Sequence, residues 1–322
     1  MENALWKIKN IRLEGLLNRH DLFWELKSNV NILGGKNGSG KSTLLHSLAF
    51  LLQTSLNDIT LDDKHIHCDA LFKSLTIELN AGASLTAKRT ADVTQETITE
   101  SPFASKIRVR EKISLETSVN KPESVDDIEF ARHILYINSA EIAVSTLSKF
   151  IENTADTKRP ARTTLDLLLE QTLNARNQIF AQRMSQAMAN NDNEQVDALR
   201  DYFGRFEFAV HTFMPEYKLI DPSTLTFSPL EDAENEYRFF RLSTGEKKLL
   251  YILLTVANTL GESTILLLDE ADLGMHIDWK KILLRELLTI NPNMQIIAAT
   301  HAPSLINGWY DNVKEITELY SV

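Results

Sequence analysis

Residues 35–42 bring glycines, a lysine and a serine together in an order that suits phosphate binding. The stretch reads GKNGSGKS and fits the pattern G-x-x-x-x-G-K-[ST]. Glycines let backbone N–H groups close around phosphate oxygens, and the start of a helix adds partial positive charge. Lys41 would neutralise the phosphates, and the Ser42 hydroxyl would bind Mg²⁺. The loop predicts a nucleotide site formed by Lys36, Asn37, Gly38, Ser39, Gly40, Lys41, Ser42 and Thr43.

Two neighbouring carboxylates, Asp269 and Glu270, follow the apolar run ILLL at 265–268. Such a run predicts a buried strand of a parallel sheet, and ligands bind at the carboxyl ends of these strands. Asp269 would hold Mg²⁺ through water, and Glu270 would act as a general base on the water that attacks a phosphate. A buried strand followed by two solvated acids is the alternative. The phosphate loop weighs against it.

The segment LSTGE at 242–246 precedes a strongly apolar helix predicted over 247–260. Ser243 and Glu246 have the spacing of a capping box, in which each side chain bonds the backbone of the other. The cap does not account for Gly245. A glycine in the first turn of a helix costs about 1 kcal/mol relative to alanine. That cost is understandable if the backbone must approach another group closely. We therefore predict a second anion-binding site at this helix start.

The elements around these motifs predict an α/β fold of the P-loop NTPase type, with a central and mostly parallel sheet. Strands at 6–13 and 29–33 and a helix over 41–53 flank the phosphate loop. Alternating Thr, Ile and Val over 71–115 predict an antiparallel β subdomain, and 163–213 predicts inserted helices. We expect a single domain over 1–322, divided into an N-terminal lobe (1–135), an inserted helical region with short strands (142–235) and a C-terminal lobe (236–322).

Composition restricts the class of partner. The chain carries 34 Lys plus Arg against 44 Asp plus Glu, a net charge of −10, which argues against general coating of nucleic acid. Binding to DNA or RNA would need a local strip of basic residues on one face of a strand. The alternative interpretation of such a strip is a sheet face that is simply exposed to solvent. That strip consists of Lys106, Arg108, Arg110 and Lys112. A single cysteine and no apolar stretch of about 18 residues lead us to expect a cytoplasmic protein without membrane insertion.

GGKNGSGKST, LSTGE, LLLDE and ATH together resemble the motifs of the ABC-type ATPase superfamily. Heads of that family dimerise head to tail around ATP. The resemblance therefore implies that Ser243 and Gly245 contact the ATP held at Lys41 of a second chain. His301 matches the family's switch histidine at the γ-phosphate, so Glu270 and His301 are implied as catalytic residues. A helix cap or a satisfied core histidine is the alternative for His301.

The opening KIKNIRLEG narrows the resemblance to the RecF- and SMC-like branch of ABC ATPases. The chain is similar to the compact AAA-family ATPases of bacterial anti-phage defence systems of the Septu, retron and OLD types. By this resemblance Arg12 is the arginine expected near the phosphates, with an exposed strand arginine as the alternative. The family's Q-loop glutamine has no clear match, and both Gln53 and Gln95 stay open.

The implied function is an Mg-ATP-binding and hydrolysing ATPase that works as a homodimer or higher homo-oligomer. It would control a separate effector protein, such as a nuclease, in anti-phage defence or another DNA-linked process. One alternative is the ATP-binding subunit of a membrane transporter, against which Glu246 and the Arg12 opening weigh. Another is an ATP-dependent scaffold that holds a nuclease or toxin partner inactive.

Overall fold

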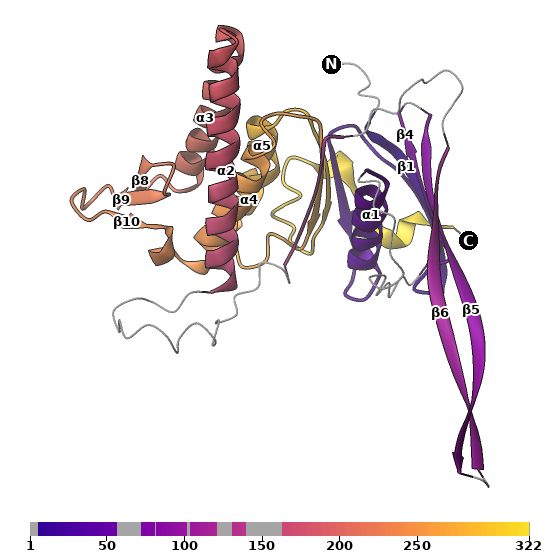
Figure 1. Ribbon diagram of the computed structural model, residues 1–322. Helices are drawn as coiled ribbons and strands as arrows, with labels where there is room; N and C mark the ends of the chain where they lie inside the picture. Colours follow the sequence, from indigo (N-terminus) through magenta and orange to yellow (C-terminus); the bar gives the residue numbers. More distant parts are fainter. Residues whose placement is uncertain are drawn as a thin grey trace.

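A parallel sheet of five strands runs through the middle of the computed structural model (Figure 1). Its strand order is β13 (Val313–Glu315), β3 (Val30–Gly34), β12 (Met294–Ala299), β11 (Thr264–Asp269) and β7 (His133–Asn138). The structure describes residues 6–56, 72–80, 82–101, 104–120, 131–139 and 163–321, with the backbone alone for 54–56, 90–101 and 104–115.

This sheet is buried on both of its faces. Along β11, Leu266 and Leu268 belong to one hydrophobic cluster, whereas Ile265 and Leu267 belong to another on the opposite face. Successive side chains of a strand point to opposite faces, so a strand covered on both sides must be apolar at every position. The continuous ILLL run therefore follows from the position of β11 inside the sheet.

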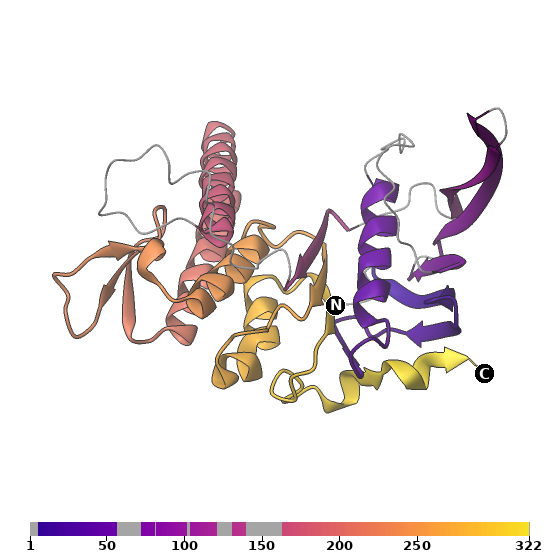
Figure 2. The same cartoon turned by 90° about the horizontal axis from the view of Figure 1, so that it is seen from below.

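On one face, helix α1 (Lys41–Leu56) lies between the parallel sheet and a second, antiparallel sheet (Figure 2). The strands of the second sheet are, in order, β14 (Tyr320–Ser321), β2 (His20–Glu25), β1 (Ile8–Leu16), β4 (Ser74–Leu79), β5 (Ser84–Ser101) and β6 (Ala104–Asn120). Both sheets contribute to the hydrophobic cluster around α1. This packing fixes the helix that begins at the phosphate loop.

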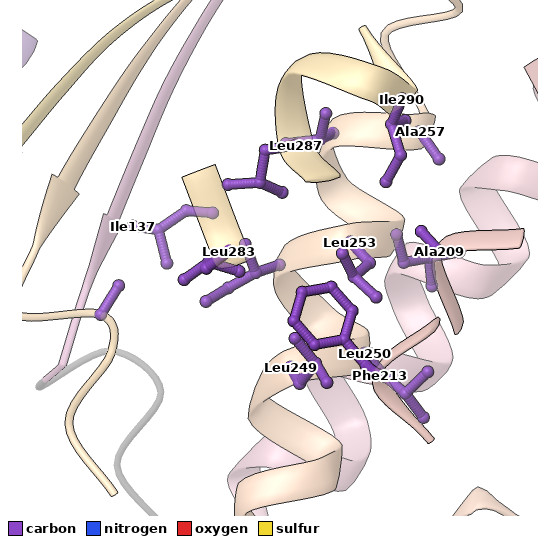
Figure 3. Packing of buried hydrophobic residues seen from close by; sticks show 14 of the residues in the cluster. Ile137, Ala209, Phe213, Leu249, Leu250, Leu253, Ala257, Leu283, Leu287 and Ile290 are labelled. Atoms are coloured by element: carbon purple, nitrogen blue, oxygen red, sulfur yellow. The ribbon is translucent and has the colours of Figure 1, made fainter. Parts of the chain in front are cut away.

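The opposite face of the parallel sheet is covered by helices. They are α2 (Thr164–Ala189), α3 (Asn193–Phe213), α4 (Thr244–Ala257) and α5 (Ile277–Ile290). Figure 3 shows Leu250 and Leu253 of α4 near Phe213 of α3, with Leu283 of α5 close by. Because α4 contributes apolar side chains to several neighbours, it is the central helix of this layer.

Short elements complete the chain. A small antiparallel sheet of β8 (Tyr217–Asp221), β9 (Thr226–Pro229) and β10 (Tyr237–Arg238) lies beside α3. Among the described residues, the 3-10 turns are η2 (Phe239–Arg241), η3 (Tyr310–Asn312) and η4 (Ile316–Leu319). Within the ranges given above, no helix has the length and apolar character needed to cross a bilayer. The predicted fold class is confirmed: a parallel α/β core with an antiparallel β subdomain and inserted helices.

The predicted antiparallel region contains the long hairpin formed by β5 and β6, which projects from the body in Figure 1. The strand pairing places Asp92 opposite Lys112 and Glu96 opposite Arg108. An acidic position therefore faces two of the four basic positions that we considered for nucleic-acid contact. The side chains of Lys106, Arg108, Arg110 and Lys112 lie outside the described part of the structure, and the contact stays a prediction.

Candidate active site

The phosphate loop joins the end of β3 to the start of α1. Gly38 and Gly40 adopt φ angles of +75° and +95°, a region that L-residues with side chains rarely occupy. A Cβ atom on Gly40 would lie 2.9 Å from Leu16 Cδ2, so β1 presses directly against the loop there. Glycine at position 40 is required both by the backbone angle and by this close approach.

Lys41 is nearly buried, with a relative exposure of 4%, and its ammonium group turns back toward the loop. Nζ donates to the carbonyl oxygens of Gly35 at 2.8 Å and Lys36 at 3.1 Å. Burial lowers the pKa of Lys41, while the nearby carboxylates of Glu270 and Asp269 act in the opposite direction. Nζ of Lys41 therefore lies inside the loop, bonded to two of its carbonyl oxygens and near the two carboxylates.

Ser42 and Asp269 meet at the junction of α1 and β11. The Ser42 hydroxyl donates to Asp269 Oδ1 at 2.9 Å, and the Tyr136 hydroxyl donates to Oδ2 at 3.3 Å. Burial raises the pKa of Asp269, although both hydrogen bonds favour its charged form. Sequence reasoning missed Tyr136. The pairing of β7 with β11 brings Tyr136 to this carboxylate, and no local motif around Tyr136 marks that pairing in the sequence.

Glu270 and His301 face each other across the ends of β11 and β12. His301 Nε2 lies 3.2 Å from Glu270 Oε1 and 3.0 Å from Lys41 Nζ. Nε2 can bond only one of these two partners at a time. Without a proton it accepts a hydrogen bond from Lys41, and with a proton it donates one to Glu270. Glu270 has a φ of +51°, an uncommon angle for a residue with a side chain and one that occurs at functional sites.

These side chains line a pocket of about 310 Å³. Its lining consists of Leu17, Asn37, Gly38, Ser39, Gly40, Lys41, Ser42, Thr43, Glu270 and His301. The buried Ser39 hydroxyl has no hydrogen-bond partner among the described atoms. A buried cation, a helix start and an unpaired donor suit a phosphate chain, and Ser42 with Asp269 offers the oxygen ligands that Mg²⁺ prefers.

Asp269 is not part of this lining, but it accepts the hydrogen bond from the lining residue Ser42. Two further residues predicted for the nucleotide site, Lys36 and Arg12, also lie outside it. Lys36 has an exposed side chain and contributes its carbonyl oxygen to Lys41. Arg12 is exposed on β1, with its guanidinium 5.8 Å from the centroid of the Phe23 ring. The structure does not bring either side chain into the pocket, and their contact with phosphate stays a prediction.

The predicted second anion site lies in a different hollow, of about 910 Å³. Ser243 and Glu246 form the expected capping box at the start of α4. A Cβ on Gly245 would lie 3.2 Å from the carbonyl oxygen of Gly274, so the close approach inferred for this glycine is made within the chain. Both Ser243 and Gly245 line the hollow, and none of the phosphate-loop residues does.

A buried ion pair lies next to the LSTGE segment at 242–246. Lys247 Nζ of α4 is 2.8 Å from Asp166 Oδ1 of α2, with side-chain exposures of 11% and 4%. Asp166 also caps α2, since its Oδ2 accepts from both the backbone N–H and the hydroxyl of Thr163. The inserted helices are thereby tied to the helix that begins at Ser243.

A phosphate loop between β3 and α1 and a carboxylate pair at the end of β11, which β12 separates from β3 in the same parallel sheet, define an SMC-head-like P-loop ATPase fold. A family model described as "AAA domain, putative AbiEii toxin, Type IV TA system" matches residues 30–307. The chain belongs to this AAA-domain family. The segment from residue 308 onward, which includes β13 and β14, lies beyond the matched residues.

Curated relatives point to the same class. "Retron Vc95 probable ATPase" of Vibrio cholerae serotype O1 biovar El Tor is 25% identical over 54% of this chain and 36% of its own length. "Retron Ec83 probable ATPase" of Escherichia coli is 27% identical over 31% of this chain and 20% of its own. The matches thus span about a third and a fifth of these relatives. They confirm the predicted resemblance to ATPases of retron type.

A solved structure shows the same fold. An SMC head bound to the C-terminal winged-helix domain of ScpA aligns with a TM-score of 0.50 and 15% identity. The alignment covers 93% of this chain and 90% of the SMC head chain. The resemblance to the SMC- and RecF-like branch that KIKNIRLEG indicated is confirmed at the level of the fold.

Proposed function

We propose that this protein binds Mg-ATP in the 310 Å³ pocket, hydrolyses it, and dimerises head to tail around the nucleotide. The observation that carries the proposal is the convergence of Lys41, Ser42, Asp269, Glu270 and His301 from three separate elements. A buried lysine and two carboxylates placed within hydrogen-bonding reach of a helix start have the chemistry of phosphoryl transfer to water.

Each side chain would have a distinct role. Lys41 Nζ now donates to the carbonyl oxygens of Gly35 and Lys36. With nucleotide bound, it would donate to phosphate oxygens instead. Ser42 and Asp269 would hold Mg²⁺, which neutralises charge that develops on the phosphates. The backbone N–H groups of residues 37–43 would orient the phosphate chain.

Glu270 would accept a proton from the attacking water. His301 lies 3.2 Å from its Oε1 and so can hold the carboxylate in place. A γ-phosphate would offer His301 an anionic partner in place of the Lys41 ammonium group. Water activation would therefore depend on the nucleotide being a triphosphate.

A second copy would complete the site. Ser243 and Gly245 lie in a hollow that shares no lining residue with the nucleotide pocket. This arrangement supports a model in which the α4 N-terminus of one chain meets the nucleotide of the other. We include Arg12 as a further phosphate contact in the assembled dimer.

We further propose that nucleotide-dependent dimerisation controls a separate effector, such as a nuclease, in anti-phage defence. The named retron relatives and the winged-helix partner in the SMC head structure support this class of role. Lys247 and Asp166 give a physical route for control, since they connect α4 to the inserted helices.

The test of the proposed activity is phosphate release from Mg-ATP by the purified protein. Glu270→Gln should lower the rate at least about 100-fold, the scale expected on losing a general base, while nucleotide still binds. Lys41→Ala should remove binding itself. Glu231→Gln, at an exposed position away from the pocket, is the matched control and should leave the rate unchanged. Equal rates in all four proteins would refute the proposal.

A further inference from the structure

The end of the described chain passes beneath the phosphate loop. This C-terminal arm, residues 313–321, joins the parallel sheet through β13 and the antiparallel sheet through β14 (Figure 2). Glu315 pairs with Gly34 beside the loop's start, and Tyr320 pairs with Leu22 of β2. The arm is thus fixed at both ends by strand pairing and spans the two sheets between which α1 lies.

Three arm residues contact the loop. A Cβ on Gly34 would lie 2.8 Å from Glu315 Oε1, and one on Gly35 would lie 2.8 Å from Ile316 Cγ2. Ile316 is fully buried. The Tyr320 hydroxyl donates to the carbonyl oxygen of Ser39 at 2.7 Å. The arm therefore supports the loop near its start and again near its end.

The Tyr320 ring is itself held in position. It stacks on the His20 ring with a centroid distance of 4.2 Å and an interplanar angle of 5°. Burial raises the pKa of Tyr320, which keeps the hydroxyl protonated and able to donate. Because stacking holds the ring and the hydroxyl carries a proton, Tyr320 donates its hydrogen bond in a fixed direction.

That bond controls a backbone N–H on the ligand side. The Ser39 carbonyl and the Gly40 N–H belong to one planar trans peptide and point in opposite directions. When Tyr320 holds the carbonyl toward the arm, the N–H of Gly40 is directed away from it. Gly40 lines the nucleotide pocket, whereas Tyr320 does not. The hydrogen bond thereby selects the orientation in which Gly40 can donate to a phosphate.

We propose that Tyr320 is a positioning residue for nucleotide binding, which acts on the phosphate loop through its hydrogen bond to Ser39. This inference rests on the proposed function and adds a loop-supporting role for the C-terminal arm. Because a phosphate loop of this pattern holds phosphates that ATP and ADP share, Tyr320 should affect both nucleotides alike. His301, by contrast, is placed for the γ-phosphate that ATP alone carries.

The experiment measures the Kd of Mg-ATP and Mg-ADP by calorimetry for the full chain. Tyr320→Phe keeps the ring and removes the donor, and should weaken both nucleotides about 3- to 10-fold, the scale of one hydrogen bond. The matched control is Tyr310→Phe, since the exposed Tyr310 hydroxyl bonds only the Asn307 side chain among the described residues. Its Kd values should stay unchanged.

A second variant and a second readout separate positioning from general destabilisation. His20→Ala leaves the hydroxyl but frees the ring, and should weaken both nucleotides by a smaller factor. His301→Ala should weaken ATP more than ADP, which contrasts with the equal losses expected for Tyr320→Phe. A variant that is only less stable, but still folded, should bind both nucleotides as the unsubstituted protein does. If the Kd values of Tyr320→Phe and His20→Ala for both nucleotides equalled those of the unsubstituted protein, this inference would be overturned and the proposed function would be unaffected. Failure of the unsubstituted protein to bind either nucleotide would overturn the proposed function as well.

Discussion

The Ser42 hydroxyl donates to Asp269 Oδ1 at 2.9 Å, although the two residues are 227 positions apart in the chain. Ser42 lies in the first turn of α1, and Asp269 ends β11, whose apolar side chains pack on that helix. The pair therefore marks the point where the N-terminal and C-terminal parts of the chain form one site. Any change at this contact should affect folding and ligand binding together.

Asp269→Asn should change folding stability and metal-nucleotide binding in opposite directions. Burial and the neighbouring Glu270 raise the pKa of Asp269, so its negative charge opposes folding at neutral pH. The neutral amide should therefore stabilise the ligand-free protein, measured by urea unfolding at pH 7. Mg²⁺-dependent nucleotide binding should fall. A destabilised variant would contradict this electrostatic account.

Gly40→Ala should cost more stability than Gly38→Ala. Both positions have positive φ angles, so alanine carries a similar backbone penalty of about 1–2 kcal/mol at each. Only position 40 adds a contact, because a Cβ there would lie 2.9 Å from Leu16, whereas position 38 has no atom within 4 Å. We expect a difference of at least about 1 kcal/mol in urea unfolding. Equal losses of stability would show that the Leu16 side chain moves aside without cost, which would contradict this prediction.

Lys247→Met should destabilise the fold strongly, because it leaves the carboxylate of Asp166 buried without its cation. Breaking a buried pair in this way costs about 3 kcal/mol or more. Lys281→Met is the control: Lys281 pairs with Asp278 on the exposed surface, where such pairs contribute little to stability. The difference should appear in the urea midpoint, and equal midpoints would contradict the coupling of α2 to α4.

Much of the core could be predicted because its signals are local. The phosphate loop, the ILLL strand and the capping box at Ser243 each depend on a few adjacent residues, and the structure places all three as expected. Strand β2 was missed even though its alternating Leu22 and Trp24 are buried in a half-exposed strand. Strand β2 has only six residues and directly follows a turn, which makes its alternation too short to stand out in the sequence.

The missing parts of the site depend on long-range pairing. Tyr136 reaches Asp269 only because β7 lies beside β11, and strand neighbours cannot be read from one sequence. The short strand β14 has no periodicity, so nothing in its two residues predicts that Tyr320 reaches Ser39. Such contacts arise from topology, and residue types alone do not reveal them.

Substituting Arg108 and Arg110 together with alanine should weaken any stimulation of the ATPase by DNA. Each removed phosphate contact should also lower the salt dependence of binding. Glu96 occupies the position opposite Arg108, so we expect Arg110, which faces Thr94, to contribute the larger part. Arg200→Ala, on the exposed surface of α3, is the control. Unchanged stimulation in the double variant would remove the nucleic-acid hypothesis for this hairpin.

The central claim, that two copies close around ATP, is tested most directly by the molar mass of Glu270→Gln in solution by light scattering. With Mg-ATP we predict a dimer, because nucleotide binds and is not turned over. Adding Thr244→Glu should restore the monomer: the exposed Thr244 begins α4, where a carboxylate favours the helix and repels phosphate. A Glu270→Gln protein whose mass is the same with and without Mg-ATP would contradict the account.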